Sequence, residues 1–299
     1  MSCGNQAKYR FTISTLDGFY ARRALRLIPA LAIVAVFQLV RSVFSQNGNE
    51  IREATLVAMA YIENWNMIYG WWPIDYMGTT WSLSVEEQFY LLWPLTLVFI
   101  VNKRPLVWIV ASVTAMTLAE LLFWRGGGAG TEHTLQFSLG IRPVGLLIGI
   151  AIAFLPISRW RMPPLMAPAM LLAIGSIALA ADRSAYVFLS APLAVSLATA
   201  ILIICTNRSG PITATLSATP IRYIGKISYG LYLYHVPILL LAEEHKVHLP
   251  FFLYGIGILV LVFATAILSY EFVEKPILGL KGRFQRQRAE LQPEGLKQA

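Results

Sequence analysis

The sequence predicts an all-α membrane protein, a polytopic bundle of about eight transmembrane helices with both termini in the cytoplasm. Hydrophobic residues make up 57% of the 299 residues and charged residues only 13%, which leaves less polar surface than a soluble domain of this length needs. The hydrophobic residues also fall into blocks of about 17 to 23, the length that crosses a bilayer core. Finally, the basic residues gather between blocks on one side.

Eight hydrophobic blocks follow one another along the chain. We expect membrane-spanning helices near residues 24–44, 86–102, 105–123, 140–156, 165–181, 187–205, 228–243 and 251–273. A further block, residues 54–69, is interrupted by Glu63, Asn64 and Asn66. We expect an interfacial or re-entrant helix there, because polar residues at membrane depth need cover from the protein.

The basic residues decide the predicted orientation. With a cytoplasmic N-terminus, the inside segments hold 18 of the 24 Lys and Arg residues, as the positive-inside rule requires. We therefore expect a basic cytoplasmic segment (1–23), a transmembrane domain (24–278) and a charged cytoplasmic tail (279–299) in the inner or plasma membrane. The net charge of +8 suits an anionic inner leaflet, and its dispersal over loops excludes nucleic acid as the favoured partner.

The stretch TWSLSVEEQFYLLWP at 80–94 places two acids at the mouth of an apolar helix. Ser84 and Glu87 have the spacing of a capping box, in which both side chains accept hydrogen bonds from free N–H groups at the helix start. Glu86 instead shares a face with Ser82 and Tyr90. A carboxylate beside aromatic residues at the membrane edge needs a partner or a substrate, so we predict a functional role for Glu86.

This stretch resembles the signature of the acyltransferase type 3 family, membrane enzymes that O-acylate sugars such as O-antigen, Nod factors and other glycans. Three more stretches match family segments in order and spacing: FYARRALRLIPA (19–30), IGKISYGLYLYHVPI (224–238) and LSYEFVEKPI (268–277). The resemblance implies that an acyl group, we expect acetyl, moves from acyl-CoA to a hydroxyl of a carbohydrate or lipid-linked glycan. Acyl-CoA is then a cosubstrate, and no bound cofactor is expected.

The family pattern has two helices ahead of its R-R-x-x-R segment, and the eight blocks here resemble those that follow. The family's catalytic His lies on the first of those two helices. We therefore expect a start codon assigned too late, a truncated gene, or a separate polypeptide that supplies the two helices. Two other functions stay open on the sequence alone: a non-catalytic remnant, and a transporter or flippase for a lipid-linked sugar.

Arg22, Arg23 and Arg26 lie at the cytoplasmic start of the first block. Positive-inside anchoring explains such a cluster about as well as a specific site does. The planar fork of Arg suits phosphate oxygens, and the family resemblance implies that this segment meets acyl-CoA. We therefore predict that these arginines bind the phosphates of CoA.

His235 lies in the middle of a block, three residues after Tyr232. Pro237 frees a backbone carbonyl near Leu233, to which an imidazole N–H could donate. The residue is then a hydrogen-bonded packing histidine or, alternatively, a general base, because neutral imidazole exchanges protons near neutral pH.

The acceptor side is predicted from the signature. We expect Trp81, Ser82, Glu87 and Tyr90 to shape it beside Glu86. Two further aromatic residues, Trp71 and Trp72, could stack on a sugar ring, but an interfacial aromatic belt is the simpler interpretation.

Glu274 closes the last block, where Lys275 and Pro276 are expected to end the helix. An acid at a helix C-terminus opposes the helix dipole, so we expect a cation such as Arg26 nearby. No metal site is predicted, since neither cysteine has a ligand at zinc spacing.

Overall fold

The computed structural model describes most of the chain. It covers residues 13–96, 144–155, 165–179, 185–206, 210–245 and 249–279, with single positions between residues 107 and 163. Within these ranges every element of regular secondary structure is a helix, as predicted. The chain divides into two compact units. Unit 1 comprises Met1–Phe11, Tyr61–Gly70 and Trp81–Arg222, and unit 2 comprises Thr12–Ala60, Trp71–Thr80 and Tyr223–Ala299.

Unit 2 is built around the long first helix. Its elements are α1 (Ile13–Phe44), α2 (Gly48–Met59), η1 (Gly78–Thr80), most of α11 (Thr219–Glu244), α12 (Phe251–Ser269), the π turn η4 (Tyr270–Glu274) and α13 (Lys275–Gly279). Helix α1 packs against α2, η4 and α13. The chain turns from α1 into α2 at Gly48, where a Cβ atom would lie 2.0 Å from the carbonyl oxygen of Ser42.

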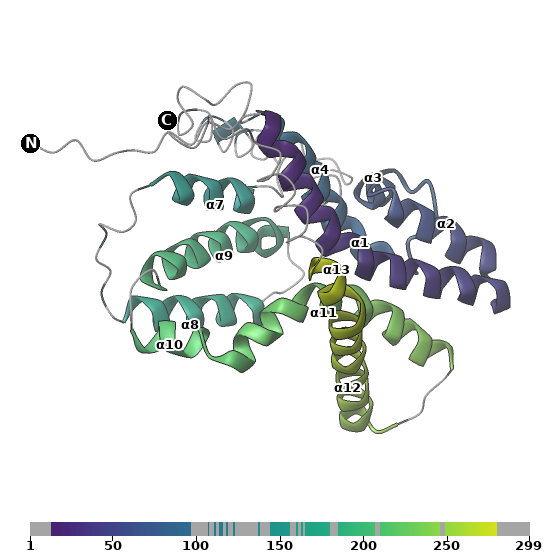
Figure 1. The fold of residues 1–299 in the computed structure, drawn as a ribbon. Coiled ribbons are helices and arrows are strands. Elements are labelled where there is room, and N and C mark those ends of the chain that lie inside the picture. The colour runs from purple at the N-terminus through teal and green to yellow at the C-terminus, as the bar shows by residue number, and fades with distance from the viewer. Residues whose placement is uncertain are drawn as a thin grey trace, which may run out of the picture. The chain divides into compact units, whose positions relative to one another are not determined.

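Unit 1 contains the remaining helices. They are α3 (Glu63–Tyr69), α4 (Trp81–Thr96), α7 (Val144–Phe154), α8 (Met166–Leu179), α9 (Ala185–Thr206) and α10 (Pro211–Leu216). Helix α9 packs against both α7 and α8 and runs between them (Figure 1). Helix α3 packs against α4. Phe89 of α4 and Leu147 of α7 form a buried apolar cluster with Trp93 and Ile150 around it.

The described helices include three that are long and apolar enough to cross a membrane: Gly18–Phe44, Thr219–Glu244 and Phe251–Gly279. Three shorter apolar helices, Val144–Phe154, Met166–Ile177 and Ala191–Thr206, lie within other predicted spans. The predicted span at 105–123 falls almost wholly outside the described residues. An all-helical membrane protein is therefore supported, while eight spans, the three predicted domains and two cytoplasmic termini stay predictions.

Two local predictions are wrong. The block at 54–69 is not one helix but parts of two, α2 and α3, because the backbone of Tyr61 adopts the left-handed conformation with φ of 54°. The helical path also continues through Pro276 to Gly279 instead of ending there. Pro276 is the second residue of α13, directly after a π turn, and proline is tolerated in the first turn of a helix.

Candidate functional site

Three of the four segments that resemble the family pattern meet inside unit 2. The Tyr229 hydroxyl, from segment 224–238, donates a hydrogen bond to the backbone carbonyl of Leu27 at 3.2 Å. Leu27 belongs to segment 19–30 and directly follows Arg26. The third segment, 268–277, forms the end of α12, the π turn and the start of α13, which pack against α1.

A buried chain of hydrogen bonds links α11 to the end of α12. The Tyr234 hydroxyl donates to Oγ of Ser269 at 2.7 Å, and the Ser269 hydroxyl donates to Oε1 of Glu274 at 2.8 Å. All three side chains are buried. Ser269 and Glu274 are five residues apart, a spacing that would separate them by about 140° around an α-helix. The π turn brings them together, and such turns are frequent at functional sites.

The predicted arginine cluster lies on the first turns of the spanning part of α1. Arg22 and Arg26 are exposed and Arg23 is half-buried. The positive charge of Arg26 acts on the buried carboxyl group of Glu274. The prediction that Glu274 has a cation nearby is thereby confirmed for Arg26.

His235 is half-buried in the middle of α11, where its Nδ1 atom contacts the backbone carbonyl of Tyr232. The carbonyl used is thus one residue before the predicted one, that of Leu233. Because a carbonyl only accepts, Nδ1 carries a proton, and in the neutral ring the lone pair is then on Nε2. The Tyr232 ring lies 5.5 Å from the imidazole, and its hydroxyl donates to the carbonyl of Thr79 at 2.5 Å.

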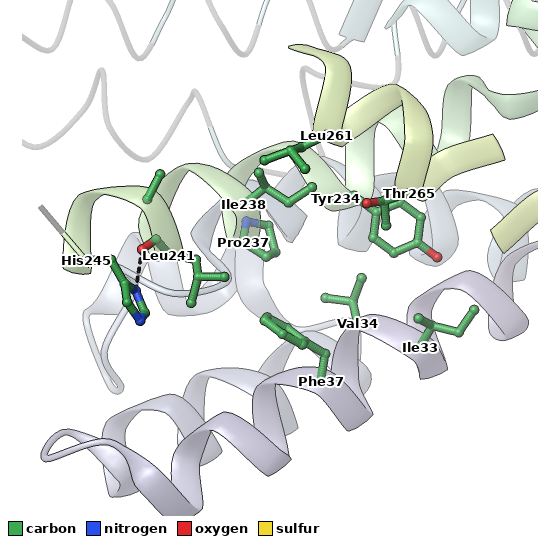
Figure 2. Close-up of a pocket in the computed structure, with 11 residues that line it drawn as sticks. Ile33, Val34, Phe37, Tyr234, Pro237, Ile238, Leu241, His245, Leu261 and Thr265 are labelled. Carbon is green, nitrogen blue, oxygen red and sulfur yellow. Dashed lines mark hydrogen bonds between the residues drawn. The ribbon is translucent and has the colours of Figure 1, made fainter. Parts of the chain in front are cut away.

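An apolar cavity of about 510 Å³ lies between α1, α11 and α12 (Figure 2). Phe37, Pro237 and Leu261 are among the residues that line it. Figure 2 shows the His245 ring beside its own helix, where Nδ1 contacts the Leu241 carbonyl at 2.9 Å. Such a lining suits a hydrocarbon chain better than a charged group.

The signature stretch forms α4. All five signature residues that we singled out lie on this helix: Trp81, Ser82, Glu86, Glu87 and Tyr90. Glu86 is exposed, whereas the other four are half-buried. Trp81 packs edge-to-face against Phe137, with ring centroids 4.9 Å apart, and Tyr90 packs on the apolar cluster shared with α7.

The capping box predicted for Ser84 and Glu87 is not formed. Helix α4 begins at Trp81, so Ser84 lies inside it. The buried Ser84 hydroxyl accepts a hydrogen bond from the backbone N–H of Glu63 at 3.2 Å. Glu63 is the first residue of α3, and the first N–H groups of a helix have no partner within it. Ser84 therefore caps the neighbouring helix instead of its own.

Asn64 and Gln88 form a reciprocal amide pair between α3 and α4. Gln88 Nε2 donates to Asn64 Oδ1 at 2.9 Å, and Asn64 Nδ2 donates to Gln88 Oε1 at 3.3 Å. Gln88 also donates to the carbonyl of Tyr61 at 2.7 Å. A tyrosine in the left-handed region is strained, so this bond helps to hold the turn before α3.

The carboxyl group of Glu63 is completely buried in the same cluster. Its Oε1 atom accepts a hydrogen bond from Asn66 Nδ2 at 3.1 Å, and its Oε2 atom has no hydrogen-bond partner among the described residues. Burial disfavours the charged form and raises the pKa of Glu63 to about 7, against the opposing effect of the Asn66 hydrogen bond. A carboxyl group that exchanges its proton near neutral pH is typical of functional sites.

Comparison with known proteins identifies the family. The profile of a family described as acyltransferase domains matches residues 6–271. The chain belongs to this acyltransferase family. The resemblance found in the four sequence segments is thereby confirmed.

Curated relatives of the acyltransferase family include OatA of Staphylococcus aureus, named as an O-acetyltransferase. It is 28% identical over 296 residues, which cover 90% of this chain and 48% of OatA. YrhL of Bacillus subtilis, named as a putative peptidoglycan O-acetyltransferase, is 27% identical over 287 residues, or 87% of this chain and 45% of YrhL. The chain thus spans about half the length of these relatives. No solved structure matches the chain significantly.

The predicted site residues of this acyltransferase domain are shared between the two units. Glu86 and its neighbours on α4 belong to unit 1, whereas His235 and the arginine cluster belong to unit 2. Their catalytic and binding roles stay predictions. Within the described part of the chain, no group of three or more His, Cys, Asp or Glu side chains is placed to hold a metal ion.

Sequence reasoning missed the partners of two side chains, Glu63 and Ser269. It placed Glu63 only as an interruption of an apolar block, although Ser84 of the signature lies against it. It also gave no role to Ser269, which joins Tyr234 to Glu274. A usable signal was present for Glu63: an acid inside an apolar block has to be covered by polar groups of the protein.

Proposed function

We propose that this chain is the membrane part of an O-acyltransferase that moves an acyl group from acyl-CoA to a hydroxyl of a cell-surface glycan. The family membership and the names of the curated relatives support the reaction class and the glycan acceptor. We expect acetyl as the group transferred. The proposal includes the predicted topology, with eight spans, both termini in the cytoplasm and the arginine cluster on the cytoplasmic side.

The observation that carries the proposal is the arrangement around Arg26. The segment with Arg22, Arg23 and Arg26 is fixed to α11 by the Tyr229 hydroxyl, and Arg26 faces the charge of Glu274. Guanidinium groups held on one helix, with Arg22 and Arg26 exposed, suit the phosphates of CoA, because a guanidinium group can donate two parallel hydrogen bonds. This segment is therefore the proposed acyl-CoA site.

In the proposed reaction the glycan hydroxyl oxygen attacks the thioester carbonyl, so that a C–O bond forms and the C–S bond breaks. A base takes the hydroxyl proton, and the CoA thiolate takes up a proton as it leaves. His235 is one candidate base, because Nδ1 is engaged with a carbonyl and the lone pair lies on Nε2. The exposed carboxylate of Glu86 is the other. The remaining α4 residues, Trp81, Ser82, Glu87 and Tyr90, are proposed to contact the acceptor.

The test uses the full chain in lipid nanodiscs. Acetyl-CoA is titrated at several salt concentrations, and we expect the affinity to fall as salt screens the phosphates. Replacing Arg22, Arg23 and Arg26 together by Ala should weaken binding about a hundredfold or more, because each charge-assisted hydrogen bond contributes about 1.5–3 kcal/mol. Transfer of radiolabelled acetyl to a glycan is then measured on the same samples.

The matched control is Arg52→Ala, which removes an exposed arginine of α2. It should leave the acetyl-CoA affinity unchanged. A triple variant that keeps both the affinity and its salt dependence would show that the arginines serve only as anchors. Intact acetyl-CoA binding with no transfer to any glycan would overturn the proposed reaction and favour a remnant or a carrier.

A further inference from the structure

Two exposed tryptophans, Trp71 and Trp72, lie on the loop that precedes η1 and α4. Trp71 is 55% exposed and Trp72 is 38% exposed. Their rings meet edge-to-face, with centroids 5.6 Å apart and planes at 78°. Two indole planes that meet nearly at right angles form a corner, and the electron-rich face of an indole attracts weakly positive C–H groups.

The loop that carries this corner is held within unit 2 by contacts of Tyr76 and Met77. The carbonyl of Tyr76 accepts a hydrogen bond from Gln38 Nε2 at 3.3 Å, and its hydroxyl accepts one from Asn47 Nδ2 at 2.9 Å. The Arg41 guanidinium lies over the same ring, 5.4 Å from its centroid. Met77, which follows, is buried. These contacts fix the second half of the loop, which reduces the entropy lost when a ligand binds there.

The loop itself carries one acid and no Lys, Arg or His between Trp71 and Thr80. That acid, Asp75, follows Trp72 by three residues, and its exposed carboxylate takes part in no hydrogen bond or ion pair with the residues that the structure describes. The Arg41 guanidinium over Tyr76 is already paired with Glu244 at 2.6 Å. Aromatic belts that rest on anionic lipid are commonly accompanied by Lys and Arg. An exposed carboxylate on the same loop as exposed indoles instead favours a neutral ligand with many hydroxyl donors.

We propose that Trp71 and Trp72 form a binding platform for a neutral pyranose ring, with Asp75 accepting hydrogen bonds from its hydroxyls. The C–H groups on one face of a pyranose match an indole face, and its equatorial hydroxyls point outward, where a carboxylate can accept from them. As part of the glycan acceptor site the platform rests on the proposed function. As a sugar-binding site it is tested separately, without acyl-CoA.

The experiment titrates a soluble N-acetylglucosamine trimer into the full chain in nanodiscs and follows tryptophan fluorescence. We expect a saturable change in the wild type. Trp72→Ala should weaken binding about tenfold, the scale of one lost aromatic contact. Trp72→Phe keeps a ring and should bind with intermediate affinity, and Asp75→Asn should bind several-fold more weakly. Far-UV circular dichroism confirms that each variant is folded.

The matched control is Trp160→Ala, because Trp160 is 39% exposed, close to Trp72, and lies outside the loop. It should leave trimer binding unchanged. No saturable change in the wild type, or equal weakening by Trp72→Ala and Trp160→Ala, overturns the platform. Brominated lipids provide the second arm: if they quench the Trp71 and Trp72 contribution, the pair lies in lipid and the proposal is wrong. Trimer binding without acetyl transfer would reject the proposed function and keep the platform.

Discussion

Among the described residues, each unit buries one glutamate, and the surroundings of the two carboxyl groups differ. Glu274 in unit 2 accepts a hydrogen bond from the Ser269 hydroxyl and faces the positive charge of Arg26. Glu63 in unit 1 has one amide donor, from Asn66, and an Oε2 atom without a partner among the described residues. In unit 2 a hydroxyl donor and a cation lie near the buried carboxyl group. In unit 1 the buried carboxyl group has only one amide donor among the described residues, and burial favours its neutral form.

This difference shows that burial alone does not determine how a carboxyl group affects stability. The neighbours decide whether removing the group leaves a charge unpaired or relieves a desolvation penalty. Removing the carboxyl group should therefore destabilise unit 2, where a donor and a cation lose their partner, and stabilise unit 1 at a pH where Glu63 would be charged. The comparison can be tested directly with single variants.

The largest effect is expected for Glu63→Gln at alkaline pH. The unfolded chain loses the Glu63 proton around its ordinary pKa of 4.5, whereas the folded pKa is about 7. The wild-type free energy of unfolding should therefore fall as pH rises through this window, by about 3 kcal/mol in total. Glutamine has no ionisable carboxyl group, so the free energy of unfolding of the variant should not decrease through this pH window. The variant should therefore be more stable than the wild type above about pH 7.

Thermal unfolding in detergent micelles at a series of pH values measures this effect. Glu53→Gln is the control, because Glu53 is an exposed acid on α2. It should keep the wild-type pH dependence. If Glu63→Gln unfolds with the same pH dependence as the wild type, the description of Glu63 as a neutral buried acid is wrong.

The second effect is expected for Glu274→Ala. It leaves the buried Ser269 hydroxyl without an acceptor and removes the carboxylate that faces Arg26, so it should destabilise the folded state by about 2 kcal/mol. Glu271→Ala, one turn away, removes an ion pair with the exposed Lys275 and a hydrogen bond from the Tyr223 hydroxyl. It should cost clearly less, because solvent screens these contacts. Equal losses in the two variants would contradict the distinction between a buried network and a surface pair.

A smaller effect is expected for Tyr234→Phe. The change removes the hydroxyl that donates to Ser269 but keeps the donation from Ser269 to Glu274. The loss of one buried hydrogen bond should cost about 1 kcal/mol in denaturant unfolding. Tyr254→Phe on α12 serves as a control, because the Tyr254 hydroxyl has no bond to the described residues. A zero effect for Tyr234→Phe would show that the hydrogen-bond chain is not needed for stability.

The smallest effect is expected for Glu244→Gln. Glu244 pairs with Arg41 at 2.6 Å; the Glu244 side chain is 42% exposed and that of Arg41 is 10% exposed. Arg41 keeps the Gln38 amide and the Tyr76 ring as partners when Glu244 is changed. The loss should therefore be about 0.5 kcal/mol at low ionic strength and smaller at high salt. Unfolding midpoints measured at two salt concentrations test this, and a loss that does not shrink at high salt would contradict screening at the exposed Glu244 end.

Much of the helical pattern could be predicted from hydrophobic blocks. The block at 187–205 corresponds to α9 (Ala185–Thr206) and the block at 165–181 to α8 (Met166–Leu179). The length of a hydrophobic block follows from bilayer thickness, so such helices can be predicted from the sequence. The break at Tyr61 was not readable, because a left-handed tyrosine carries no local signal and is held by Gln88, which lies 27 residues later.

In the candidate site, too, local sequence predicted some features, and distant contacts determined the others. The four motif segments gave the residue types, and the prediction that a cation lies near Glu274 was correct for Arg26. The capping box at Ser84 failed because a local spacing rule assumes that a hydroxyl caps its own helix. In the fold, a longer-range partner was available at the start of α3, and tertiary contact decided between the two.

The π turn at Tyr270–Glu274 has a consequence for how this sequence can change. It holds one residue more than an α-helical turn would. The number of residues in this stretch therefore matters as well as their identity. Deleting a single residue, such as the exposed Phe272, would close the turn into an α-helical one, in which Ser269 and Glu274, then four residues apart, still share a face. One residue can therefore be lost here without turning the end of the helix, whereas one more inserted residue would rotate everything after it by about 100°.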